Sequence, residues 1–220
     1  MIDLSRKLTD KLVIDDKEYA LDLSFDNVLK MFEMMRDDDI PEYIKPHFAI
    51  RMLISKSLAG TTREEKAKSF NNDFENYSIE EMSKVFKSVF EEHISLSDVK
   101  DNHVEYDLAG NPMKTTASDD TKQRAPYDIR YDGDYIYASF LQAYGIDLFD
   151  AQGKLHWKKF NALLSGLPEG TKFMEVVKIR KWKPQKGDSA EYKEEMRKLQ
   201  KDYALPNDTI VDEEYKEEEF

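Results

Sequence analysis

The segment SIEEMSKVFKSVF, residues 78–90, carries the clearest folding signal in the chain. Ser78 and Glu81 form a capping box, in which the serine hydroxyl accepts from the amide of Glu81 and the glutamate reaches back to the amide of Ser78. The apolar residues that follow recur every three or four positions and so share one helix face: Ile79, Met82, Val85, Phe86, Val89 and Phe90. The segment therefore predicts an amphipathic helix that packs on a core.

Upstream, the sequence predicts a short β-hairpin and then a helix. Residues 11–25 place two apolar runs on either side of the turn-prone tripeptide Asp15-Asp16-Lys17. Ser24 is expected to cap the helix, which should end in the acidic run 37–39. Its apolar residues form one stripe: Phe25, Val28, Leu29, Phe32 and Met35.

The other helices are expected from their end signals and apolar spacing. One begins near Pro41 and Pro46 and runs towards Gly60, and it is apolar over so much of its surface that we expect it in the centre of the fold. Further helices are expected within 132–145, 154–166, 171–182 and 189–203. Residues 176–181 half alternate, so a strand is the alternative there, although a helix is favoured.

These signals predict a mainly α fold, α+β only through its small N-terminal β-hairpin, with a helical-bundle architecture. Residues 96–126 show no sustained period and almost no apolar mass, which is typical of a linker or a mobile loop. The expected organisation is 1–95 for the hairpin and helices, 96–126 for the linker, 127–206 for an aromatic-rich C-terminal helical region and 207–220 for an acidic tail. Whether the helices form one bundle or two subdomains stays open.

Composition excludes several classes of function. The 220 residues hold 33 Lys+Arg against 45 Asp+Glu, and the net charge of −12 argues against a nucleic-acid-binding face. Cysteine is absent, which excludes disulfide scaffolds, thiol catalysis and Cys-ligated metals. No apolar run approaches the roughly 18 to 20 residues that span a bilayer, and residues 1–10 lack the core of a signal peptide. We therefore expect a cytoplasmic protein that binds neither nucleic acid nor membrane.

No motif indicates catalysis. Glycine-rich phosphate loops, nucleophile elbows and zinc-binding helix motifs are missing. The histidines have no partner at ligand spacing and are interpreted as structural or surface residues: His47, His93, His103 and His156. We expect no enzyme and no cofactor. The alternative is a hydrolase or nuclease that uses Asp128, Asp132 or Asp134 with a divalent ion, but helix-capping and turn roles are favoured for these residues.

One basic segment departs from the acidic average. Residues 172–186 hold six cationic side chains against Glu175 alone, with Trp182 among them. A surface for nucleic acid or an acidic partner is one interpretation, and a solvated helix face that pairs with the acidic residues after 189 is the favoured one. Residues 212–220 hold six acids and one lysine, and we expect them to fray and to repel one another.

The helix expected over residues 135–144, YIYASFLQAY, carries aromatic or apolar groups on most of its faces. It is either fully buried or partly exposed as a docking surface for another chain. The sequence leaves both interpretations open.

The same residues resemble a known family. The similarity is carried by DYIYASFLQAYGIDL at 134–148, LHW at 155–157, KFNALL at 159–164, LPEGTKF at 167–173 and YALP at 203–206. In these segments the chain resembles the bacteriophage gene-product-fifteen family of phages and prophages of Gram-positive bacteria. The hairpin and first helix look like the start of the same family. Lys158 departs from it, since many relatives carry a second tryptophan at that position.

The resemblance implies a gene in the tail module beside the tape measure gene. From that position follows a role as a tail assembly chaperone, which binds and solubilises the tape measure protein in the cytoplasm of the bacterial host and is absent from the virion. The tail tube protein is a second candidate partner. This inference rests on gene position rather than on site chemistry. The alternative is a structural tail component of the virion, such as a tail completion or baseplate-proximal protein.

Partner contacts are expected on the aromatic helices, and the sequence leaves open whether the protein also forms a homo-oligomer. Aromatic side chains on an amphipathic helix are typical anchors for a helical partner. The residues predicted to touch the partner are Tyr137, Phe140, Tyr144, Trp157 and Phe160.

Overall fold

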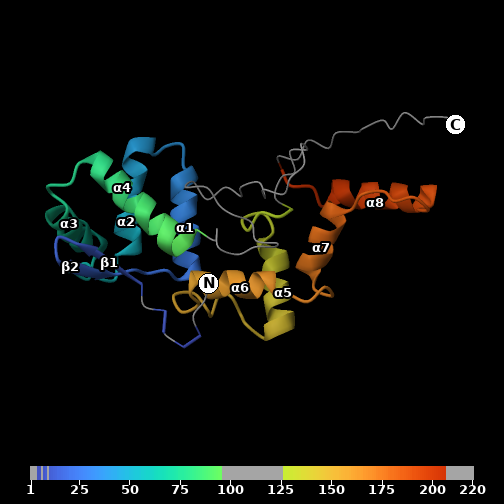
Figure 1. Ribbon diagram of the computed structural model, residues 1–220, viewed down its shortest axis with the longest axis horizontal. Helices are drawn as coiled ribbons and strands as arrows, with labels where there is room; N and C mark the ends of the chain where they lie inside the picture. Colours follow the sequence, from blue (N-terminus) through green and yellow to red (C-terminus); the bar gives the residue numbers. More distant parts are fainter. Residues whose placement is uncertain (1–3, 6, 9, 96–125, 207–220) are drawn as a thin grey trace. The chain divides into compact units, whose positions relative to one another are not determined.

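The computed structural model describes residues 4–5, 7–8, 10–95 and 126–206 (Figure 1). The expected linker up to residue 125, His103 within it and the acidic tail 207–220 lie outside this part of the chain. The described elements are β1 (Lys11–Ile14), β2 (Lys17–Ala20), α1 (Phe25–Arg36), the 3-10 helix η1 (Glu42–Ile44), α2 (Lys45–Leu53), α3 (Arg63–Asp73), α4 (Ile79–Val89), the π-helix η2 (Phe90–Ile94), α5 (Gly133–Tyr144), α6 (Trp157–Ser165), α7 (Lys172–Lys181) and α8 (Ala190–Asp202). The mainly α fold with a small N-terminal hairpin is confirmed.

The chain forms two compact units that interleave along the sequence. The first contains Met1–Ala125 and Gly145–Gly166, and the second contains Pro126–Tyr144 and Leu167–Phe220. Helix α6 therefore belongs with the N-terminal elements, whereas the sequence segments placed it in one region, 127–206, with α5 and α7. The reason is long-range: the backbone before α6 bonds to residues near position 24, which no local pattern reveals.

The hairpin of the first unit is fixed by its turn. Asp15 and Asp16 have φ angles of 47° and 63°, and two consecutive left-handed residues make the tight turn whose twist matches antiparallel strands. The register pairs Lys11 with Ala20 and Leu12 with Tyr19. The ring of Tyr19 is buried and lies 5.6 Å from that of Phe74, so an aromatic contact is one of the links between the hairpin and the helices.

Three helices supply a large part of the core of the first unit. Helix α2 packs on both α1 and α4, as Figure 1 also shows, which confirms its expected central position. Each helix buries one face, and the residues on these faces include Phe25, Val28, Met31, Phe32 and Met35 of α1, Ala49, Ile50 and Leu53 of α2, and Met82, Phe86 and Val89 of α4.

Helix α2 ends at Leu53 and not near Gly60 as expected. The carbonyl of Leu53, which a longer helix would need for itself, accepts a hydrogen bond of 2.6 Å from the amide of Asp22. The hydroxyl of Ser57 then bonds both the amide and the carbonyl of Ala20, at 2.8 and 3.1 Å. Tertiary hydrogen bonds to the hairpin thus end the helix before its apolar pattern ends.

The N-terminal cap expected for α4 is confirmed, whereas the one expected for α1 is not formed. The capping box of Ser78 and Glu81 is present in full. A second one, formed by Thr62 and Glu65, starts α3, a helix that was not expected, and carries the same four-residue signature. Ser24 precedes α1 but its side chain makes no capping bond; its hydroxyl donates to Asp22 Oδ1 at 2.9 Å.

Helix α6 completes the first unit. The amide of Phe25 donates to the carbonyl of Leu155 at 2.9 Å, and the amide of Trp157 donates to the carbonyl of Leu23 at 2.7 Å. Trp157 is fully buried, and its indole N–H donates to the carbonyl of Ile94 at 2.9 Å. One residue therefore connects α6 with the entry to α1 and with the end of η2.

In the second unit α5 packs on α7, and α7 contacts α8. Residues 172–181 are helical, which decides between the helix and the strand left open for 176–181. The hydroxyl of Ser139, buried on α5, accepts from the amide of Phe173 in the first turn of α7 at 3.0 Å. Helix α8 has no buried residue, as its thin apolar seam indicated. None of the described helices is long and apolar enough for a membrane span.

The capping box of α4 is expected to contribute measurably to stability. Ser78→Ala removes the hydroxyl that accepts from the amide of Glu81 and should lower the free energy of unfolding of the first unit by about 1 kcal/mol. Ser88→Ala is the matched control, since Ser88 is an exposed residue of the same helix, and it should change stability by less than about 0.5 kcal/mol. Urea denaturation followed by circular dichroism compares the two. Equal effects would contradict the role given to the cap.

Candidate functional site

The five residues predicted to touch a partner lie in different units. Tyr137, Phe140 and Tyr144 belong to α5 in the second unit, and Trp157 and Phe160 belong to α6 in the first. Within α5 the rings of Phe140 and Tyr144 meet edge to face, with centroids 5.7 Å apart. Within α6 the rings of Trp157 and Phe160 are stacked at 5.9 Å. The five residues do not form one site within either unit.

Three of the five are core residues. Phe140 and Trp157 have 0% of their surface exposed and Phe160 has 1%, so they offer no surface to a partner in this conformation. Phe160 stacks on Phe25 with centroids 5.0 Å apart, and Trp157 meets Phe32 edge to face at 5.8 Å. As partner contacts these three side chains stay a prediction, and in this conformation they belong to the core. Large aromatic groups gain more from burial in a packed core than from partial exposure.

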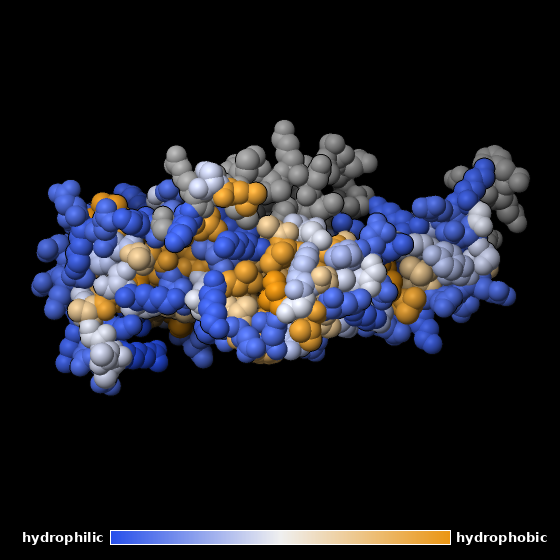
Figure 2. Space-filling view, turned by 90° about the horizontal axis from the view of Figure 1, so that it is seen from below, coloured by the Kyte–Doolittle hydropathy of each residue, from blue (hydrophilic) through white to orange (hydrophobic). Residues whose placement is uncertain are grey.

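The outer face of α5 keeps the rest of the predicted surface. Tyr137 and Tyr144 are half-buried, and burial raises the pKa of the Tyr144 phenol. Leu141 lies between them on the same face, because residues four and three positions apart are neighbours on a helix, and 46% of it is exposed. Among the described residues, Val13, Ile79 and Phe149 are at least as exposed as Leu141. Figure 2 shows hydrophobic areas among hydrophilic side chains on one face of the molecule. We refer to Tyr137, Leu141 and Tyr144 as the α5 face.

A polar cluster that the sequence did not predict lies in the first unit. The carboxylate of Asp10 binds two histidines, with Oδ1 2.9 Å from His93 Nδ1 and Oδ2 2.7 Å from His156 Nε2. The amide of Lys158 donates to His156 Nδ1 at 3.1 Å, so the proton of a neutral His156 ring is on Nε2 and is donated to Asp10. The hydrogen bond from His156, followed by that from His93, holds the pKa of Asp10 well below its usual range.

The π-helix η2 positions one of these histidines. Its wider turn bonds the amide of Ser95 to the carbonyl of Phe90 at 2.7 Å, and it follows directly on α4. His93 and Ile94 both lie in this turn, so the imidazole reaches Asp10 while the carbonyl of Ile94 accepts from Trp157. The cluster thus joins the segment before β1, the end of α4 and the start of α6.

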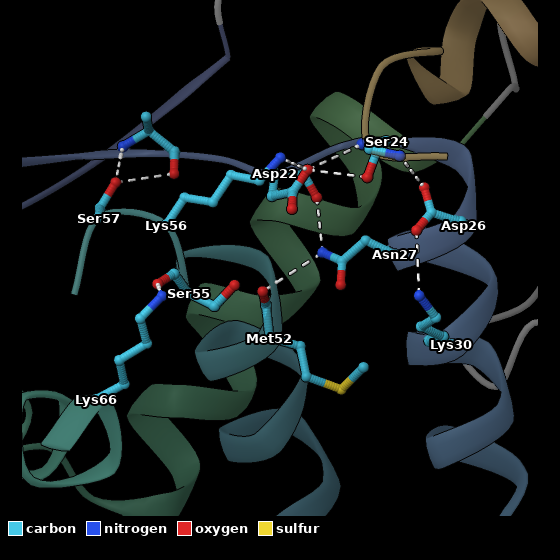
Figure 3. A network of polar contacts seen from close by, with 12 residues as sticks. Asp22, Ser24, Asp26, Asn27, Lys30, Met52, Ser55, Lys56, Ser57 and Lys66 are labelled. Atoms are coloured by element: carbon cyan, nitrogen blue, oxygen red, sulfur yellow. Dashed lines mark hydrogen bonds and ion pairs between the residues drawn. The ribbon is translucent and has the colours of Figure 1, made fainter. Parts of the chain in front are cut away.

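A second polar network ties the hairpin exit to α1 and to the end of α2 (Figure 3). Asp22 Oδ1 accepts from the Ser24 hydroxyl and lies 2.9 Å from Lys56 Nζ. The side-chain amide of Asn27, on α1, donates to the carbonyl of Asp22 at 2.8 Å and points in Figure 3 towards the carbonyl of Met52. The bonds from Asn27 satisfy two backbone carbonyls, those of Asp22 after β2 and Met52 in α2, which indicates a structural role.

In the second unit Arg180 and Asp132 form a buried ion pair. Both guanidinium nitrogens, Nη1 and Nη2, lie 2.7 Å from a carboxylate oxygen, and Asp132 has no exposed surface. Arg180 Nε also donates to the carbonyl of Tyr203 at 2.6 Å. The favoured interpretation of the basic segment, pairing with acids after residue 189, is wrong for Arg180, whose carboxylate partner lies 48 residues before it.

Two of the carboxylates considered for a divalent ion are bound to other groups of the chain. Asp132 is occupied by Arg180, and Asp128 Oδ1 accepts from the amide of Arg130 at 2.8 Å, which is the turn role favoured for it. Within residues 10–95 and 126–206, no group of three or more acidic, histidine or cysteine side chains has the spacing to hold a metal ion. In the Asp10 cluster both carboxylate oxygens are already used by histidines. The Asp10 cluster therefore has the arrangement of a structural contact that holds segments of the first unit together.

The Asp10 cluster is expected to stabilise the first unit above the acid range. Because the folded-state pKa of Asp10 lies below its unfolded value, its contribution is present above about pH 4 and is lost as pH falls towards the folded value. Asp10→Asn leaves one histidine N–H facing an amide N–H and should lower the free energy of unfolding by about 1–3 kcal/mol at pH 7. The difference from the natural chain should shrink towards pH 2. Thermal unfolding at pH 7, 4 and 2.5 measures it.

Asp39→Asn is the matched control for this experiment. Asp39 is exposed, and the substitution removes the same charge from the same side-chain shape, so we expect little change at any pH. Equal losses in the two variants, or a loss in Asp10→Asn that stays constant from pH 7 to pH 2.5, would contradict the role of the cluster.

Comparison with known proteins gives one result. No curated protein and no solved structure matches the chain. The model of one protein family, described as Bacteriophage Gp15 protein, matches residues 8–205 and so spans both units and every described helix. On this match over most of its length, the chain belongs to the bacteriophage Gp15 protein family.

Proposed function

We propose that this protein is a non-catalytic tail assembly chaperone that binds the tape measure protein and keeps it soluble in the host cytoplasm. Membership of the Gp15 family makes it a phage protein with a structural or assembly-related role. The finer assignment depends on where such a protein could hold a long helical partner. Such partners bind through apolar residues spaced along one face.

The observation that carries the proposal is the α5 face. Leu141 exposes nearly half of its surface in the middle of a helix whose opposite side is buried through Ile136, Ser139 and Phe140. The two tyrosines that flank this exposed aliphatic group are of a residue type enriched among the residues that dominate binding energy at protein interfaces. The rigid inner side of α5 would keep that contact in place for successive helical segments of a partner.

The charge of the chain supports the same proposal. A net charge of −12 repels like molecules and raises the solubility of a complex that contains exposed apolar segments. The negative charge also disfavours nonspecific capture of nucleic acid, which surrounds any phage protein during assembly. Both properties suit a protein that holds an aggregation-prone partner.

Co-expression with the tape measure protein tests this function. The natural chain should bring that protein into the soluble fraction as a complex measurable by size-exclusion chromatography with light scattering. Leu141→Glu should weaken the complex by about tenfold or more, since it would bury a carboxylate in an apolar contact and a loss of ~1.4 kcal/mol is tenfold in affinity. Ile79→Glu is the control, because Ile79 is similarly exposed but lies in the first turn of α4, where a carboxylate is tolerated.

Two outcomes would contradict the proposal. If the tape measure protein stays insoluble and no complex forms, the protein is not its chaperone. If mass spectrometry of purified phage particles finds the protein in fixed copy number, it is a structural component of the tail.

A further inference from the structure

The basic segment of the second unit contains lysines with no acidic partner in the described part of the chain. Lys172 donates to the hydroxyl of Tyr203 and Arg180 is bound to Asp132, so these two cations are used inside the unit. The other four are exposed, and no described carboxylate lies within 4.0 Å of their ammonium groups: Lys178, Lys181, Lys183 and Lys186. A compact group of unpaired cations remains at one end of α7.

Two aromatic rings accompany these lysines. Trp182, the residue after α7, meets Tyr192 of α8 edge to face with centroids 5.9 Å apart, and 43% of Tyr192 is exposed. Lys178 and Lys181 are one turn apart on α7, while Lys183 and Lys186 lie in the connection to α8. We call the four lysines with Trp182 and Tyr192 the lysine–aromatic surface.

The chain end leaves the described structure beside this surface. Arg180 Nε donates to the carbonyl of Tyr203, and the side-chain amide of Gln200 donates to the carbonyl of Trp182 at 2.9 Å. The last turn of α8 is therefore fastened to the C-terminal end of α7. Residues 207–220 follow within four positions of Tyr203, and 14 residues can extend about 45 Å at roughly 3.3 Å each.

The composition of residues 207–220 complements that of the lysine–aromatic surface. Residues 212–220, DEEYKEEEF, carry six carboxylates and one lysine together with a tyrosine and a phenylalanine. Carboxylates can pair with the four lysines, and aromatic rings can pack against Trp182 and Tyr192. The chain as a whole is acidic, whereas residues 172–186 are basic.

We propose that residues 207–220 dock on the lysine–aromatic surface of the same molecule. Single exposed ion pairs are weak and are screened by salt, so docking depends on several pairs formed together. The short connection makes this feasible, because it holds the tail near the surface at an effective concentration of the order of millimolar. An acidic partner of this surface would have to displace the tail. The inference does not depend on the proposed function.

Paramagnetic relaxation in the full-length protein tests the docking. The chain has no cysteine, so Tyr215→Cys provides the single attachment point for a nitroxide and leaves every tail charge in place. In 15N-labelled protein at low salt, the amide signals of residues 178–186 should lose more than half of their intensity relative to the reduced label. At 1 M salt, where the Debye length is about 3 Å, the signals should recover.

Charge reversal supplies the matched comparison. Lys181→Glu with Lys183→Glu should abolish the broadening of this surface, while Lys84→Glu with Lys87→Glu, exposed on α4, makes the same change in net charge and should leave it intact. No selective broadening at low salt, or equal effects of both double variants, would overturn the proposal. Broadening seen only when spin-labelled and 15N-labelled molecules are mixed would overturn docking within one molecule and show that a second copy supplies the tail.

Discussion

The first unit depends on the burial of Trp157. Its backbone amide binds the carbonyl of Leu23, its indole N–H binds the carbonyl of Ile94, and its ring lies against those of Phe32 and Phe160. Each polar group of this large side chain is satisfied while the whole of its surface is removed from water, a combination that stabilises without leaving an unpaired donor. The Asp10 cluster reinforces the same junction, because His156 immediately precedes Trp157 and His93 immediately precedes Ile94. The end of α4, the entry to α1 and the start of α6 are thereby held at one place.

This constraint explains the interleaved course of the chain and the surplus of aromatic residues in its second half. The chain passes from the second unit back to the first after Tyr144, where Gly145 takes a φ of 64° that other residues rarely adopt, and returns to the second unit after Gly166. The aromatic residues of 135–160 are thus divided between two cores instead of forming one docking surface. The surface that stays exposed for a partner is smaller than the expected one and consists of Leu141 with the two tyrosines beside it on α5.

Local signals predicted most elements of the fold but not its long-range pairings. The hairpin, the α4 capping box and the helical nature of α7 depend on neighbouring residues, and each was predictable from spacing and turn chemistry. The end of α2 was not, because an amide at Asp22 takes the carbonyl of Leu53. Nor were the Asp10–His156 and Asp132–Arg180 pairs, whose members lie 146 and 48 residues apart, since no sequence period marks such partners. For the candidate site, aromatic composition identified α5 correctly as unusual, yet burial decided which rings could reach a partner.

The central claim is that α6 is part of the first unit and not an appendage to it. Native-state hydrogen exchange of the full-length protein, followed by NMR, tests this claim through the amides of Phe25 and Trp157, which bond across the junction to Leu155 and Leu23. Both amides should exchange only when the whole unit unfolds, with the same free energy of opening as amides in the middle of α2. Rapid exchange of these two amides while α1 and α2 stay protected would contradict it.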